Sequence, residues 1–372
     1  MYRNVLGIAL AVCVSSPAIV AADGHQTGII TSQHGYVLTE LASGLEHPWG
    51  LDWLPDGRIV VTERPGRIRI VDETGRISEP LSGVPEIVSD FRDGLLDIAV
   101  SPEFTNDRTV FFAYSQKADE LRWLEIAAAR LTEDGLEDLR VIHTAEVRVE
   151  QDQGFGSRLR FDAQGNLVAT VGDHAQGPTA QDTTNTLGSI IRIARDGSAV
   201  PGNPKVGAAA AIYAYGFKNP QGLTIDPATG AIWATDHGGI GGGELNRIES
   251  GGNYGWPVRT FGIGDAPRAE KPGDFVEPVF TWGAAPTVAL SGLELYTGDE
   301  FPNWTGDLFT GSLVQEALIR IMLDDDGAVM GTEYVIDGTI GRVREVRQGP
   351  DGRLYVLNDD FEGGIFRLDP AR

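Results

Sequence analysis

Three short runs of this sequence contain residue types that could bind an anion or transfer a proton. In Gly172-Asp173-His174, a carboxylate stands beside an imidazole that could act as a base. Arg342 and Arg344 are two residues apart, so on a strand they share one face and could bind carboxylates through planar guanidinium groups. Lys218 adds a cation within residues 215–223. The question is which fold could bring such distant runs together.

The charge of the chain makes any cluster of cations informative. The 53 Asp and Glu residues outnumber the 30 Lys and Arg residues, which gives a net charge of −23. Nucleic acids and anionic membranes are bound by clustered Lys and Arg, so we expect neither as a partner. A local group of Arg and Lys in such an acidic chain therefore indicates a specific role for those residues, such as binding an anion.

A turn-and-strand pattern recurs six times along the chain. In each copy an apolar pair is followed by a turn of Asp, Pro, Gly or Asn and then by a β-rich run, as in residues 51–62 and 159–170. Six such units predict a six-bladed β-propeller of about four strands per blade, with loops that converge at one end of a central channel. A pair of β-sandwiches is the alternative, but it has no reason to repeat one turn pattern six times. The copies are anchored at Leu51, Ile98, Leu159, Leu223, Leu293 and Val346.

The first 22 residues read as a cleaved signal peptide. Arg3 precedes an apolar stretch over residues 5–14, and Val20-Ala21-Ala22 form a small-residue cleavage site. The stretch is too short to span a membrane, so we expect no membrane span. Lipid attachment at Cys13 is the disfavoured alternative, because Val12 is bulky where a small residue is expected. The sequence thus predicts export to the periplasm and a mature propeller over residues 23–372.

Several longer motifs in order resemble the PQQ-dependent glucose/sorbosone dehydrogenase family, whose members are six-bladed propellers. The resemblance runs from about Gly44 to the C-terminus, and no single motif carries it alone. It implies that an aldose is oxidised at the anomeric carbon to a lactone, with PQQ and Ca²⁺ as cofactors. Electrons would then pass to a cytochrome or quinone acceptor. The motifs are residues 172–174, 180–188, 215–223, 234–239, 251–257 and 341–344.

The resemblance assigns the cations and nearby amides to the cofactor. PQQ carries three carboxylates, so its site needs several cations, and Arg342 and Arg344 match the paired arginines of the family. Lys218 stands where the family has arginine, which keeps the charge but loses the planar fork. Arg92 replaces a glutamine, and it could either grip the quinone or fill its space. The run also places Asn219 and Gln221 in the cofactor site.

Calcium is implied at Gly238 and Gly239. The family binds it through the backbone carbonyls of a Gly-Pro pair, and the glycine at position 239 keeps a carbonyl. The Gly-Gly pair is more flexible, so ordering it costs more chain entropy. Gly243 also stands where the family usually has an acidic residue.

The catalytic histidine of the family is missing. The family pattern is His-Phe-Gly-Ser-Arg, and this chain has Gly154 at the histidine position, which cannot act as a base. Asp173 matches the acid that orients that histidine. His174 could have taken over as the base, unless strand alternation turns its imidazole away from the channel that Asp173 faces. Asp152 is a second candidate base. We expect Gly154→His to raise activity.

Two functions therefore stay open. One is an active PQQ-dependent aldose dehydrogenase, and the other is a divergent, non-catalytic propeller that binds a sugar, quinone or protein partner. A lactonase-like hydrolase shares only the fold class, and the sequence offers no set of calcium ligands for it. Signatures of nicotinamide binding, zinc proteases and serine hydrolases are absent from the sequence.

Overall fold

The computed structural model describes residues 29–371 except 32, 91, 151–152, 264–273 and 285. The described residues form six antiparallel β-sheets and very little helix, namely α1 (Phe104–Asp107), η1 (Gly177–Gln181) and η2 (Pro302–Trp304). None of these helices is long and apolar enough to cross a membrane. The predicted signal peptide, residues 1–22, lies outside the described residues.

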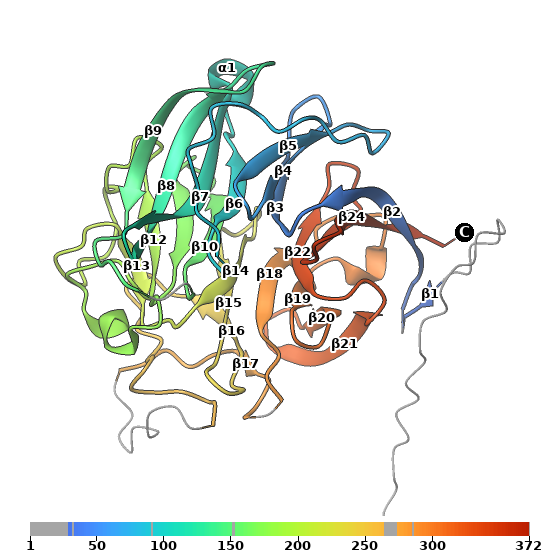
Figure 1. The fold of residues 1–372 in the computed structure, drawn as a ribbon. Coiled ribbons are helices and arrows are strands. Elements are labelled where there is room, and N and C mark those ends of the chain that lie inside the picture. The colour runs from blue at the N-terminus through green and yellow to red at the C-terminus, as the bar shows by residue number, and fades with distance from the viewer. Residues whose placement is uncertain are drawn as a thin grey trace, which may run out of the picture.

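The six sheets follow one another around a common centre, as Figure 1 shows. Their first strands pack against each other in a closed ring, in the order β3, β6, β10, β14, β18, β22 and back to β3. The predicted six-bladed propeller is therefore confirmed. Blade 1 consists of β3 (Pro48–Trp53), β4 (Ile59–Glu63) and β5 (Arg67–Val71); blade 2 of β6 (Leu95–Val100), β7 (Thr109–Ala118), β8 (Leu121–Leu131) and β9 (Leu136–Thr144); blade 3 of β10 (Gly156–Phe161), β11 (Leu167–Val171), β12 (Ser189–Ile193) and β13 (Ile212–Tyr215); blade 4 of β14 (Pro220–Ile225), β15 (Ile232–Asp236), β16 (Glu244–Ile248) and β17 (Phe280–Thr281); blade 5 of β18 (Leu290–Leu295), β19 (Leu308–Ser312), β20 (Ala317–Leu323) and β21 (Val329–Asp337); and blade 6 of β22 (Val343–Gln348), β23 (Leu354–Asn358), β24 (Gly363–Pro370), β2 (Gly35–Leu45) and β1 (Ile29–Ile30).

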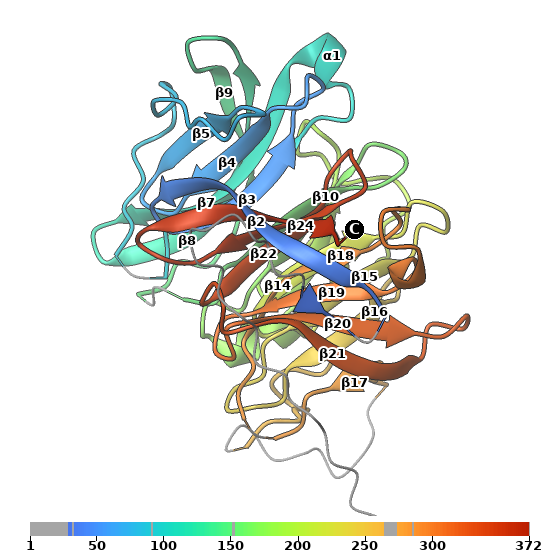
Figure 2. The ribbon, with the colours of Figure 1, turned by 90° about the vertical axis from the view of Figure 1, so that its right-hand side faces the viewer.

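Both ends of the described chain contribute to the last blade. The early strand β2 pairs with the last strand β24, with Tyr36 opposite Pro370 and Leu45 opposite Gly363. Figure 2 shows β2 lying along β24. These hydrogen bonds hold β2 in the sheet of blade 6, and the chain continues from β2 into β3 of blade 1, so the ring closes where an early strand pairs with the last one.

Hydrophobic burial explains why the repeated pattern folds into blades. Each of the six anchor residues lies on the innermost strand of its blade, and each is fully buried. Burial of a large aliphatic side chain contributes about 1.5–3 kcal/mol, so six equivalent anchors stabilise the same strand position in every blade. The spacing of the anchors in the sequence is thus the spacing of the innermost strands.

Every innermost strand has an irregularity at the start of its pairing with the second strand. The register shifts within the first residues of the strand in all six blades. Such bulges release side chains from strict alternation, so residues near these starts can be aimed at the channel mouth. The shifts occur between Pro48/Leu51, Leu95/Ile98, Gly156/Leu159, Pro220/Gly222, Leu290/Leu293 and Val343/Glu345.

A buried network of charges joins the innermost strands. The guanidinium of Arg158 donates to the carbonyl oxygen of Gln221 at 2.9 Å and to Asp97 at 3.1 Å, and it also pairs with Glu345. Burial lowers the pKa of Arg158 to about 9, although the charge of Asp97 acts in the opposite direction. The Arg158 guanidinium lies 4.2 Å from the ring centre of Trp49. One side chain thus connects strands of four blades directly behind an aromatic residue of the site.

Candidate functional site

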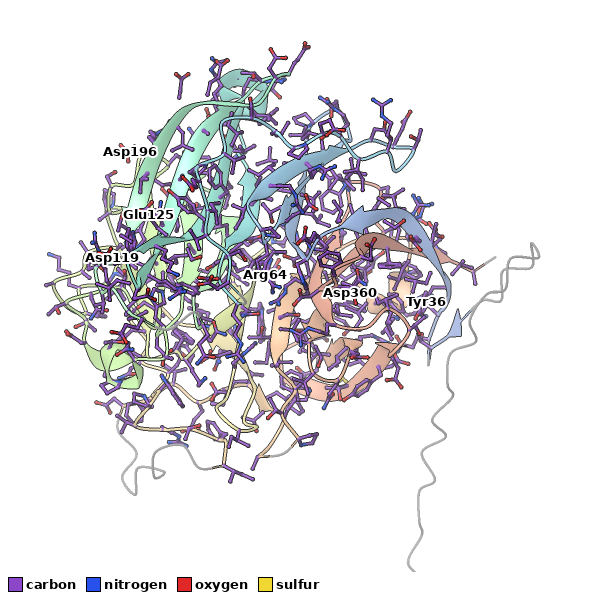
Figure 3. All side chains as sticks on the ribbon, viewed as in Figure 1. Tyr36, Arg64, Asp119, Glu125, Asp196 and Asp360 are labelled. Atoms are coloured by element: carbon purple, nitrogen blue, oxygen red, sulfur yellow. The ribbon has the colours of Figure 1, made fainter. Side chains whose placement is uncertain are left out.

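The loops at one end of the ring enclose a cavity of about 590 Å³. In five of the six blades, a residue just after the second strand lines it, and residues at the starts of the innermost strands complete the wall. Because paired strands are antiparallel, these two kinds of position meet at the same end of the channel. Arg64 and Asp360, labelled in Figure 3, lie toward the middle of that view, whereas Asp119 and Asp196 lie toward its edge. The five residues that follow second strands are Arg64, Asp173, His237, Leu313 and Asp359.

The cavity concentrates positive charge in an acidic protein. Five cationic residues line it against three acidic ones, while the whole chain carries −23. A field of this sign attracts anions into the cavity. The cationic residues are Arg64, Arg92, Lys218, Arg342 and Arg344, and the acidic ones are Asp173, Asp359 and Asp360.

Three arginines converge on one carboxylate. Arg344 donates to Asp359 Oδ2 at 2.5 Å and Arg342 to the same oxygen at 3.2 Å, while Arg64 Nη1 lies 3.6 Å from Oδ1. Burial alone would raise the pKa of Asp359, but the three guanidinium groups lower it well below its usual range. One negative charge cannot neutralise three positive ones, so this cluster keeps a net positive charge.

Lys218, Asn219 and Gln221 all line the same cavity, as the predicted cofactor site requires. Asp236 accepts hydrogen bonds from the backbone N–H groups of Lys218 at 2.8 Å and Asn219 at 2.7 Å, which fixes the loop before β14. Gln221 Oε1 accepts from Arg344 at 2.8 Å. Lys218 Nζ lies 5.5 Å from the ring centre of Trp256, and its charge acts on the carboxyl of Asp173 in the same wall. Lysine therefore offers its charge to the cavity despite lacking the arginine fork.

Arg92, from blade 2, also lines the cavity. Its guanidinium pairs with the side chain of Gln153, the residue before Gly154. The structure thus brings together all six residues predicted to bind the cofactor.

Asp173 is the acidic group on the blade 3 side of the cavity. Its Oδ2 accepts from the indole N–H of Trp256 at 2.8 Å, and its Oδ1 accepts from the backbone of Ala175 at 2.8 Å. Burial raises the pKa of Asp173, and the Trp256 hydrogen bond and the charge of Lys218 partly offset that effect. Trp256 thus orients a carboxylate, while Tyr254 packs on Phe217 with ring centres 4.5 Å apart.

His174 does not line the cavity. It follows Asp173 in a turn with φ of 50°, and its fully buried ring packs against Phe155 with centres 4.6 Å apart. Neither ring nitrogen has a hydrogen-bond partner among the described residues, and burial lowers the pKa of His174 to about 3. His174, a candidate base from the sequence, therefore lies in the core and not on the cavity wall, because the turn after Asp173 directs its ring inward. Asp152, the other candidate base, lies outside the described residues.

Gly154 lines the cavity, and its backbone conformation favours glycine. Its φ is +79°, and an added Cβ would lie 3.1 Å from the Ala175 nitrogen and 3.3 Å from Asp173 Oδ1. A histidine here would thus combine an unfavourable backbone conformation with close contacts. The expectation that Gly154→His raises activity rested on the family pattern and did not include this cost.

The two glycines predicted to hold calcium do not line the cavity. They follow His237, which does. A Cβ on Gly238 would lie 1.7 Å from the carbonyl oxygen of Gly241, so this tight loop requires glycine. Within the described ranges, no three His, Cys, Asp or Glu side chains come together as a metal site. Only the carbonyls of Gly238 and Gly239 remain as the predicted ligands.

Sequence reasoning missed a group of cavity residues on blades 1 and 6. One signal could have found two of them. Arg64 and Asp359 come just after the second strand of their blades, as Asp173 does, so inspecting that position in every repeat would have selected both. His47 precedes an innermost strand, where no motif marked it. The missed residues are His47, Trp49, Arg64, Asp359, Asp360 and Phe361.

Comparison with known proteins agrees with this geometry. Residues 45–367 match the glucose/sorbosone dehydrogenase family. The chain belongs to that family. It is 35% identical to the aldose sugar dehydrogenase YliI of Escherichia coli over 89% of this chain and 92% of the relative. It is 27% identical to the quinoprotein glucose dehydrogenase B of Acinetobacter calcoaceticus over 86% and 84%.

Solved structures of relatives share the fold. The apo form of the soluble aldose sugar dehydrogenase from Escherichia coli superposes with a TM-score of 0.84 at 33% identity, covering 90% of this chain and all of that one. The PQQ-bound form of an aldose sugar dehydrogenase from Streptomyces coelicolor gives a TM-score of 0.77 at 27% identity, covering 90% and 98%. This glucose/sorbosone dehydrogenase family member therefore has the propeller of sugar dehydrogenases.

Proposed function

We propose that this protein is a PQQ-dependent aldose dehydrogenase whose cofactor binds in the cationic cavity. The observation that supports it best is the cluster of Arg64, Arg342 and Arg344 around one carboxylate, which leaves positive charge facing a cavity in a chain of −23. The aldose sugar dehydrogenase of Streptomyces coelicolor, which shares this fold, has been solved in a PQQ-bound form. The proposed reaction oxidises the anomeric carbon of an aldose to a lactone.

The residues present fit such a cofactor. PQQ is a flat, tricarboxylated quinone, and a cavity of about 590 Å³ lies within the roughly 300–1,000 Å³ typical of small-molecule sites. Arg344 Nε is buried and has no hydrogen-bond partner among the described residues, so it could donate to a carboxylate. Arg342 and Lys218 would supply further charge. When bound, the quinone would supply the hydride acceptor that amino-acid side chains lack.

The protein's own residues would position the reactants and exclude water. Leu96, Phe155 and Trp49 give the cavity an apolar part beside the charged wall, which suits a flat ring and a sugar. Asp173, held by Trp256 and Ala175, would accept a hydrogen bond from a sugar hydroxyl. Electrons would leave toward a cytochrome or quinone acceptor, and the periplasm remains the predicted location.

Calcium stays a prediction resting on the carbonyls of Gly238 and Gly239. We derive no step through it. A non-catalytic binder is the second candidate function, because Gly154 removes the family's base from the cavity wall.

Reconstitution tests the proposal. Purified protein would be mixed with PQQ and CaCl₂, and dye reduction would be followed with glucose and other aldoses. We expect PQQ-dependent, sugar-dependent reduction that Arg344→Met weakens. Arg58→Met is the matched control, because Arg58 is an exposed turn residue paired only with Asp56 among the described residues. Tight PQQ binding without turnover would favour a non-catalytic binder of the quinone, and no PQQ binding would contradict the dehydrogenase function.

A further inference from the structure

The cavity wall includes His47, which comes from blade 1, whereas the family's base is expected on blade 3. His47 lies just before β3, and it lines the cavity together with Gly154 and Asp173. His237, the other histidine of the cavity wall, is already engaged, since its Nε2 bonds the carbonyl oxygen of Leu290 and its Nδ1 lies 3.4 Å from Asn219. Among the described histidines of the wall, His47 is therefore the one with a ring nitrogen left over.

His47 is held firmly in place. Its backbone N–H donates to the Asp360 carbonyl at 2.7 Å, and its own carbonyl accepts from the Arg64 N–H at 3.1 Å. Its φ is 47°, an uncommon conformation for a residue with a side chain, and such conformations cluster at functional sites. The ring stands edge-on to Phe361, and the side chain is 30% exposed.

One ring nitrogen of His47 is fixed by a carboxylate. Nδ1 lies 2.8 Å from Asp359 Oδ1. The arginine cluster keeps Asp359 ionised, and an ionised carboxylate can only accept, so Nδ1 carries the proton. In a neutral imidazole, Nε2 is then the acceptor, and no described residue hydrogen-bonds it. This is the arrangement by which a carboxylate orients a general base.

We propose that His47 is the proton acceptor of this site, with Asp359 as its positioning residue. The inference rests on the proposed function. The O–H bond of the sugar's anomeric hydroxyl breaks and its proton moves to His47 Nε2. The hydrogen on the same carbon would leave with its electron pair to a bound quinone, so the sugar would lose two electrons and the quinone would gain them. A base brought in from blade 1 would replace the histidine that blade 3 lacks.

His47→Asn is the decisive variant, because asparagine tolerates positive φ better than most residues and so preserves the loop. We expect kcat to fall by about 10²–10⁴, the usual contribution of a general base, while the Kd for PQQ stays within a few-fold of wild type. His34→Gln is the control, a histidine packed on Phe301 and Trp304 away from the cavity, and we expect it to leave kcat unchanged. Asp173→Asn and His174→Ala test the rival bases.

A second readout does not depend on activity. Nitrogen NMR of the imidazoles should show the Nδ1–H tautomer for His47 in wild-type protein and its loss in Asp359→Asn. If His47→Asn turned over at the wild-type rate, the inference would be overturned and the proposed function would stand. The same would follow if His47 of the wild-type protein were protonated on Nε2. Wild-type protein that binds no PQQ or never turns over would instead overturn the proposed function, and the inference with it.

Discussion

Gly154→His would place a histidine where the resemblance expects one, but the backbone conformation at Gly154 predicts that the variant is less stable. With φ of +79°, any side chain enters the left-handed region, which costs about 1–2 kcal/mol. For a chain of 372 residues, that cost corresponds to a decrease in Tm of about 1–3 °C. The new Cβ would also lie 3.1 Å from the Ala175 nitrogen and 3.3 Å from Asp173 Oδ1, so the loop holding Asp173 must shift. We therefore expect a lower Tm and no gain in kcat.

Scanning calorimetry and steady-state dye reduction would measure both effects. Gly57→Ala isolates the backbone cost, because Gly57 has φ of +87° in an exposed turn with nothing within 4 Å of an added Cβ. Gly154→Ala adds the crowding, and Gly154→His adds the ring. A Gly154→His protein with wild-type Tm and a higher kcat would refute this reasoning, and it would show that the loop accepts the family's base.

Three further predictions concern the charged wall. Arg344→Lys keeps the charge but loses the hydrogen bonds of the guanidinium fork, and a hydrogen bond to a charged group contributes about 1.5–3 kcal/mol. The Kd for PQQ should therefore rise about 10–100-fold in a fluorescence titration. An unchanged Kd would place the cofactor elsewhere. Trp256→Phe removes a hydrogen bond that lowers the pKa of Asp173, so the pKa of Asp173 should rise further in the variant. Carbon NMR of the Asp173 carboxyl would measure it. An unchanged pKa would mean that the Trp256–Asp173 hydrogen bond does not form in solution. Because the arginine cluster lowers the pKa of Asp359, the ionised carboxylate stabilises the fold at pH values above the ordinary carboxyl range, and this stabilisation is lost as the pH falls below about 4. The free energy of unfolding, measured by urea titration, should therefore fall more steeply with acid in wild type than in Asp359→Asn. Equal slopes would contradict the pairing of Asp359 with the arginines.

The fold could be predicted from the sequence because one local pattern was repeated. Buried anchors such as Leu51 and Val346 recur with the same turn chemistry, and each occupies the same strand position in its blade. Burial of equivalent side chains is a local property of each repeat, so six copies read as six blades. Closure of the ring by β2 and β24 was not predicted, because a pairing between distant segments leaves no local signal.

The candidate site was predicted only where motifs marked it. Arg342, Arg344 and Lys218 were found through the family's motifs, and the structure brings them to one cavity. His47 and Arg64 were missed because their role depends on blades 1 and 6 meeting at the closure, where Asp359 contacts both. His174 shows the converse case. It adjoins Asp173 in sequence, yet the turn directs its ring into the core.

A single-turnover measurement tests the central claim most directly. The protein would be loaded with one equivalent of PQQ, freed of oxygen and mixed rapidly with an aldose while the absorbance of the quinone is recorded. We expect stoichiometric binding and a sugar-dependent loss of the oxidised quinone spectrum, and we expect Arg344→Met to weaken both at the same PQQ concentration. Bound PQQ whose spectrum no aldose changes, or PQQ that does not bind at all, would contradict it.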